Sequence, residues 1–161
     1  MINKDFEDFF RYLNKNKVEY LVVGGYAHIY YTEPRYTKDL DILVNPTIEN
    51  SKRVYKSLCD FFGVKKLKIS QLHFTKKNKP GEFSVAIGNP PNSIEIFTNL
   101  PGIDFLKAWK NKQRFKYGKV FVWVIGINEL EKNFKTVAKI NKKLEKKYGY
   151  FIDELKKWKK G

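Results

Sequence analysis

The sequence predicts an α/β (α+β) fold, in which a mixed β-sheet is flanked by helices and further helices close the C-terminus. Short β-branched runs alternate with stretches of helical periodicity, and glycine or proline separates most of them. A long stretch after residue 127 repeats its apolar side chains every three or four positions. The chain of 161 residues fits one compact unit, and its 42% hydrophobic content is enough to fill a core.

The first half of the chain alternates helices and strands. Phe6, Phe9, Phe10 and Leu13 predict an amphipathic helix over 3–16. A strand over 18–23 is stopped by two glycines and followed by a short helix over 26–32. A second strand spans 39–44, and a helix over 48–62 begins at the N-cap Thr47 and ends at Gly63.

The second half predicts more strands and then helices. We expect strands over 72–75, 82–88, 93–98 and 119–126, with a short helix over 104–111. From Asn128 the chain is expected to be helical, with Gly149 separating a last short helix. We divide the chain into a core over 1–126 and a basic helical segment over 127–161 that packs on it.

The net charge and the cysteine content limit the location and the partners that can be expected. The single cysteine allows no intramolecular disulfide, so we expect a reducing, cytoplasmic location, and no apolar run approaches a membrane span. The net charge is +15. It indicates either a lysine-rich solvated surface or a polyanionic partner such as RNA or a nucleoside triphosphate, and both interpretations stay open.

Carboxylates interrupt two strands that are otherwise apolar. Asp39 and Asp41 point to one face of the strand over 39–44, because side chains alternate along a strand. Glu95 interrupts the strand over 93–98 in the same way. If the two strands pair, the three carboxylates converge, and divalent cations would offset their repulsion. Because this repulsion would be relieved, we expect Asp39→Ala to leave the fold intact, or even to stabilise it in the absence of metal.

Gly24 and Gly25 lie directly between a strand and a short helix. Glycine allows a positive φ and a close backbone approach, and amides at a helix N-terminus can hold phosphate oxygens. A tight turn without a ligand explains the pair equally well when it is considered alone.

Together, the stretch "GGYAHIYYTEPRYTKDLDILV" resembles the signature of the polymerase-beta-type nucleotidyltransferase superfamily. The form with Arg35, Thr37, Asp39 and Asp41 is most similar to the bacterial branch that contains abortive-infection-type toxins. The stretch "AIGNPPNSIEIFTNLPGIDF" also resembles that branch. The resemblance covers about residues 18–126 and implies a nucleotidyltransferase-like core.

The resemblance implies an enzyme that transfers a nucleoside monophosphate from a triphosphate such as ATP to an acceptor hydroxyl. Asp39, Asp41 and Glu95 would be the catalytic residues and would bind two Mg²⁺ ions, with Mn²⁺ as a substitute. The net charge makes tRNA or another RNA the first expectation for the acceptor, while a protein or a small molecule stays open. A neutralising partner protein is implied by the toxin branch.

Nucleotide contacts are implied by the same resemblance. Gly24 and Gly25 would contact the triphosphate, and Arg35 and Thr37 would steady the loop or touch phosphate. The chain also departs from the branch, because the third acid is glutamate and no C-terminal arginine element follows. Lys132, Lys135 or Lys139 would have to replace its phosphate contact, and the sequence assigns none of them. A catalytically inactive protein that binds nucleotide or nucleic acid is therefore the alternative.

Other candidate sites are weaker. His28 and His73 are expected to be packed or surface residues, since zinc ligands at suitable spacing are missing. Trp109, Trp123 and Trp158 are expected in the core or at its rim. A base-stacking surface would need aromatic residues interleaved with exposed lysines; Tyr148 and Tyr150 permit such a surface without showing one.

Overall fold

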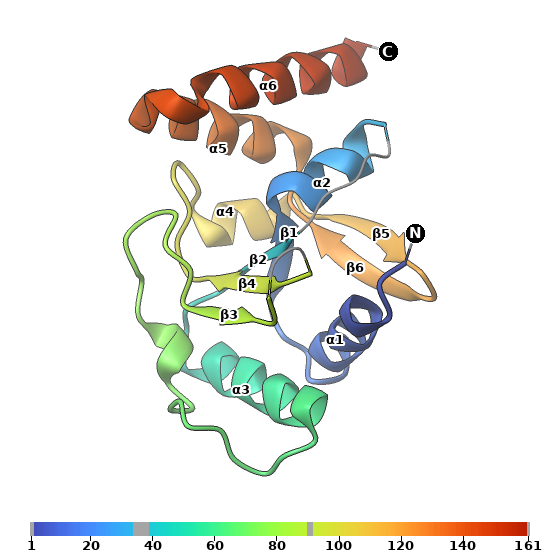
Figure 1. The fold of residues 1–161 in the computed structure, drawn as a ribbon, viewed down its shortest axis with the longest axis vertical. Helices are drawn as coiled ribbons and strands as arrows, with labels where there is room; N and C mark the ends of the chain where they lie inside the picture. Colours follow the sequence, from blue (N-terminus) through green and yellow to red (C-terminus); the bar gives the residue numbers. More distant parts are fainter. Residues whose placement is uncertain (1, 34–38, 90–91, 161) are drawn as a thin grey trace.

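The computed structural model describes residues 2–33, 39–89 and 92–160. A six-stranded mixed sheet with the order β3-β4-β2-β1-β6-β5 crosses the molecule, and helices pack on both of its faces (Figure 1). The predicted α/β (α+β) class is confirmed. Among the described residues, no helix has the length and apolar character needed to cross a membrane.

The strands are short, and the central ones are buried. They are β1 (Tyr20–Val23), β2 (Leu40–Val44), β3 (Val85–Ile87), β4 (Ile94–Phe97), β5 (Gln113–Tyr117) and β6 (Val120–Val124). β2 pairs antiparallel with β1 and parallel with β4, and β6 runs parallel to β1. The two strands that hold the predicted carboxylates are therefore neighbours, as the argument from sequence required.

The helices are α1 (Lys4–Lys15), α2 (Gly24–Tyr31), α3 (Ile48–Phe62), α4 (Phe105–Lys110), α5 (Ile127–Ile140) and α6 (Glu145–Lys160). Short 3-10 turns, η1 (His73–Thr75) and η2 (Lys142–Leu144), precede β3 and α6. Figure 1 shows α1 and α3 below the sheet, with α5 and α6 stacked above α2. α2 contacts both α5 and α6, so the C-terminal helices cover the end of the sheet where β1 stops.

Local sequence explains most helix boundaries. Asn3 caps α1 by accepting hydrogen bonds from the amides of Asp5 and Phe6, and Thr47 caps α3 by accepting one from the Asn50 amide. Gly63 ends α3 in the left-handed conformation, with φ 67°. The side chains of α1 at helical spacing are all buried, and they pack both on the sheet (Phe10 on Tyr20) and on α3 (Phe9 on Phe61).

Three expectations are wrong. The predicted strand over 72–75 is the 3-10 turn η1, because the Phe74 amide and the Gln71 carbonyl bond the Ser51 hydroxyl of α3. A strand was missed, since β5 has a mostly exposed sequence and is held by pairing with β6. Gly149 does not break the last helix, which runs through it from Glu145 to Lys160.

α5 begins at the predicted domain boundary, and the division into two units stays a prediction.

Candidate nucleotide and metal site

Asp41 and Glu95 face each other at the centre of the candidate site. The parallel register of β2 and β4 places Asp41 directly opposite Glu95, where strands lie about 4.8 Å apart. The two carboxyl groups are therefore close neighbours, and two ionised carboxylates at this spacing would repel each other.

The protonation state of Asp41 follows from its surroundings. Burial raises the pKa of Asp41 to about 8, and the neighbouring Glu95, together with the charge of Asp39, acts in the same direction. The Lys147 ammonium opposes this rise in pKa. Among the described residues, the buried Oδ1 atom of Asp41 has no hydrogen-bond partner, which is costly unless a ligand occupies the position.

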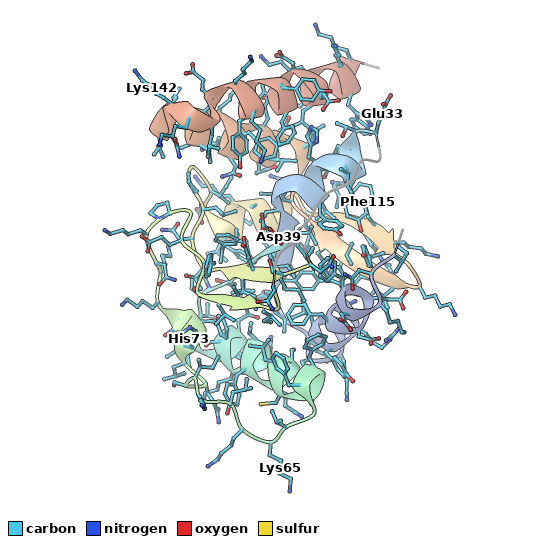
Figure 2. The ribbon with its side chains drawn as sticks, in the orientation of Figure 1. Glu33, Asp39, Lys65, His73, Phe115 and Lys142 are labelled. Atoms are coloured by element: carbon cyan, nitrogen blue, oxygen red, sulfur yellow. The ribbon has the colours of Figure 1, made fainter. Side chains whose placement is uncertain are left out.

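Asp39 precedes β2 and points to the same face, but it is engaged by serine. The Ser93 hydroxyl donates to Oδ1 of Asp39 at 2.6 Å, and the Ser93 amide donates to the same oxygen at 3.3 Å. Ser93 is only 2% exposed, so its hydroxyl is shielded from water and has Asp39 as its acceptor. Figure 2 labels Asp39 in the middle of the molecule, below α2. No sequence signal pointed to this serine beyond its position two residues before Glu95.

The glycine turn lies against the carboxyl pair. Gly24 has φ 65°, and a Cβ atom built on it would lie 2.6 Å from Oδ2 of Asp41. Only glycine fits there, because any side chain would meet the carboxylate and strain the backbone. α2 begins at Gly24, and its N-cap Val23 supplies no side-chain cap. The helix therefore presents its N-terminal end, which favours anions, beside Asp41.

A cavity of about 350 Å³ opens beside Asp41. Its walls come from the sheet, from the loop before β3 and from the C-terminal helices, and they include Gly24, Phe97, Phe134, Leu144 and Tyr148. This volume and mixture of aromatic, apolar and acidic groups are typical of a small-ligand site. Asp39 and Glu95 do not line the cavity, so Asp41 is the predicted acid that faces it.

α6 contributes residues that the sequence analysis did not assign to the site. Burial and the charge of Asp41 raise the pKa of Tyr148, and the same carboxylate interacts with the Lys147 ammonium. Of the lysines named from sequence, Lys135 is paired with Glu131 at 3.3 Å, and Lys132 lines a different cavity. Lys139 is exposed in the last turn of α5. The lysine whose charge acts on Asp41 is Lys147, which was not among these three.

The remaining predicted residues divide into three groups. Gly25 follows Gly24 in the first turn of α2. Arg35 and Thr37 fall within 34–38, outside the described residues. His28 is fully buried against Phe151, and His73 bonds the Ser84 carbonyl oxygen at 2.9 Å, in keeping with packing roles.

The carboxylates of the candidate site provide part of the ligand set that a divalent cation would need. The unpartnered Oδ1 atom of Asp41 and the raised pKa of this carboxyl group mark a place where a divalent cation could replace a proton. Asp39 would have to turn from Ser93 to join Asp41 and Glu95. Within residues 2–33, 39–89 and 92–160, no group of three or more histidine, cysteine, aspartate or glutamate side chains is close enough to hold a metal ion.

Comparison with known proteins adds no identification. No family model matches the chain, and no curated protein matches it.

Proposed function

We propose that the protein is a metal-dependent nucleotidyltransferase, which moves a nucleoside monophosphate from a nucleoside triphosphate to an acceptor hydroxyl. The observation that supports this most is the half-buried Asp41–Glu95 pair beside Gly24, at the N-terminus of α2. Two neighbouring acids shielded from water destabilise a folded protein, and a bound cation would offset that cost. The position of the pair next to an anion-favouring helix end matches a site for a phosphorylated ligand and its cation.

The chain supplies a distinct group for each part of a nucleotide. The N-terminal amides of α2 would bind the phosphates, and Lys147 would offset their charge. The cavity walled by Phe134, Leu144 and Tyr148 has room for a nucleobase and would exclude water around it. Asp41 would lose its proton when the cation binds. Mg²⁺ or Mn²⁺, once bound, polarises the transferred phosphate and activates the acceptor hydroxyl.

In the reaction, the acceptor hydroxyl would give up its proton to solvent, its oxygen would form a bond to the α-phosphorus, and the bond from that phosphorus to the bridging oxygen of pyrophosphate would break. We place the reaction in the cytoplasm, and RNA, with tRNA first, is the proposed acceptor because of the charge of +15. A toxin role and a neutralising partner protein are supported by the sequence resemblance alone.

A binding protein without turnover is the second candidate, and one observation favours it. Asp39 is held by Ser93 rather than joined to Asp41 and Glu95. If this arrangement persists when nucleotide binds, two carboxylates remain where the transfer reaction is expected to need three.

Label transfer separates the two candidates. The protein is incubated with each α-labelled nucleoside triphosphate, Mg²⁺ or Mn²⁺, and total RNA or total protein. We expect transfer that is lost in Asp41→Asn and kept in Asp153→Asn, a matched change at an exposed position of α6. Nucleotide binding without transfer, for all four nucleotides and both metals, would favour the binding protein.

A further inference from the structure

A second surface interleaves aromatic rings with cations, away from the carboxyl pair. We call it the hairpin surface. It consists of side chains from α4, from the turn after it and from the outer face of the β5–β6 hairpin: Trp109, Lys112, Arg114, Lys116, Phe121 and Trp123. β5 is the last strand of the sheet, and Figure 1 shows the hairpin at the right edge of the molecule.

The rings of this surface form one continuous row. The Trp123 ring lies 6.2 Å from the Trp109 ring and 5.6 Å from the Phe121 ring, centroid to centroid. Lys112 Nζ lies 4.1 Å above the Trp109 centroid and 4.9 Å from that of Trp123. Arg114 Cζ lies 4.6 Å above the Phe121 ring.

The pairing of the hairpin explains why these side chains share a face. Arg114 is opposite Trp123, and Lys116 is opposite Phe121 in the antiparallel register. Phe115 and Val122 pair on the other face, where Phe115 packs on Tyr30 of α2. Phe121 and Trp123 are half-buried while Arg114 and Lys116 are exposed, so aromatic and cationic groups alternate at the surface.

All charged side chains of the segment from Phe105 to Gly126 are positive. Between Phe105 and Gly126 the sequence has no aspartate or glutamate. Its cations are Lys107, Lys110, Lys112, Arg114, Lys116 and Lys119, and none of them forms an ion pair with another described residue. On α1, by contrast, Lys4 and Arg11 are paired with Glu7 and Asp8. The hairpin surface therefore complements a polyanion.

Rings and cations together select the kind of polyanion. Single-stranded nucleic acid offers both phosphates and free base faces, whereas a duplex hides its faces by stacking and a sulfated sugar has none. In the absence of ligand, Lys112 and Arg114 lie over the ring faces. Binding would exchange these cation–π contacts for base stacking and free Lys112 and Arg114 to reach phosphates.

We propose that the hairpin surface binds single-stranded nucleic acid, with bases stacked on Trp109, Trp123 and Phe121 and phosphates held by Lys112, Arg114 and Lys116. This binding needs neither the carboxyl pair nor a nucleotide, so it is separable from the proposed transfer reaction.

The test uses tryptophan fluorescence in a Trp158→Phe background, in which Trp109 and Trp123 are the remaining reporters. A single-stranded oligonucleotide of about 12 nucleotides is titrated in EDTA, without nucleoside triphosphate. A duplex of equal length and heparin serve as comparison ligands. We expect saturable quenching by the single strand, weaker binding of the duplex, and no quenching by heparin, which has no bases.

Two charge-matched variants locate the binding surface. Arg114→Glu with Lys116→Glu reverses two cations of the hairpin surface, and Lys65→Glu with Lys66→Glu reverses two exposed lysines in the loop after α3. We expect the first variant to weaken single-strand affinity by about tenfold or more and the second to change it much less. Thermal melting confirms that both fold.

Two outcomes would overturn the proposal. An equal loss of affinity in both variants would show nonspecific attraction by net charge. The second outcome is either no quenching by the single strand or equal quenching by heparin. Either result would show that no base stacks on these rings, and the hairpin surface would then belong to a partner of another class. Failure of label transfer would not bear on either result.

Discussion

Asp41 and Glu95 lie opposite each other on the parallel strands β2 and β4, and burial and Glu95 together raise the pKa of Asp41. This relationship joins two residues 54 positions apart in the sequence. It also makes the site sensitive to pH, to cations and to the residues that surround it.

The pH dependence of stability tests the state of Asp41. Its pKa is about 8 in the folded protein, against an ordinary value of 3.8. Folded protein thus holds a proton that unfolded protein releases, and the free energy of unfolding should fall as pH rises from about 4 to about 8, then level off. Asp41→Asn removes this contribution and should be more stable than the parent at pH 8 in EDTA, by about 2 kcal/mol or more.

Urea unfolding across this pH range measures the difference between the two proteins. Asp153→Asn is the control and should follow the parent curve. Parallel curves for the parent and Asp41→Asn would show that Asp41 is ionised in the folded protein at neutral pH.

Asp39 is expected to behave differently, and here the structure changes the expectation from sequence. Asp39→Ala leaves the buried Ser93 hydroxyl without its acceptor, so it should cost about 1–2 kcal/mol in metal-free buffer. A double-mutant cycle with Ser93→Ala should give a coupling energy of about 1 kcal/mol, because one hydrogen bond is lost in all three variants. Strict additivity would mean that the bond contributes nothing.

Replacing glycine by alanine should have opposite effects on stability at two positions. Gly24→Ala should destabilise by about 2 kcal/mol or more and abolish nucleotide binding, since its Cβ would lie 2.6 Å from Asp41 Oδ2 at a φ of 65°. Gly149→Ala lies inside α6 with no atom within 4 Å of its added Cβ. It should raise stability by about 0.5–1 kcal/mol. Thermal melting of both variants checks the pair, and similar melting temperatures would contradict the placement of Gly24.

Lys147 is expected to assist nucleotide binding. Lys147→Ala should weaken the affinity for a nucleoside triphosphate by about tenfold, as one charge-assisted contact is lost. Lys143→Ala, at an exposed position of η2, is the matched control and should bind normally. Isothermal titration with a nonhydrolysable triphosphate and Mg²⁺ compares them. Equal affinities for the two variants would remove Lys147 from the site.

The parts of the fold that could be predicted are those fixed by local patterns. The bounds of α3 follow from the N-cap Thr47 and the left-handed Gly63, and α1 follows from its row of buried phenylalanines. β5 was missed because its sequence alternates without a fully apolar face and depends on β6 for its hydrogen bonds. Gly149 does not end a helix as expected, because tertiary packing of α6 on α5 outweighs the low helix propensity of one glycine.

The candidate site was predictable to a similar extent. Alternation along two strands places Asp41 and Glu95 on one face, and the structure brings them together. The interaction of Asp39 with Ser93 could not be predicted, because it depends on the register between strands 54 residues apart. Lys147 was missed for a related reason: its position beside Asp41 depends on how α6 packs over α2, which no short motif encodes.

The most direct test of the central claim is a crystal structure with Mn²⁺ and a nonhydrolysable nucleoside triphosphate. We predict an anomalous manganese peak about 2.1 Å from carboxylate oxygens of Asp41 and Glu95, with the phosphates at the N-terminus of α2 beside Gly24. Manganese or triphosphate bound elsewhere, with no cation beside Asp41 and Glu95, would contradict it.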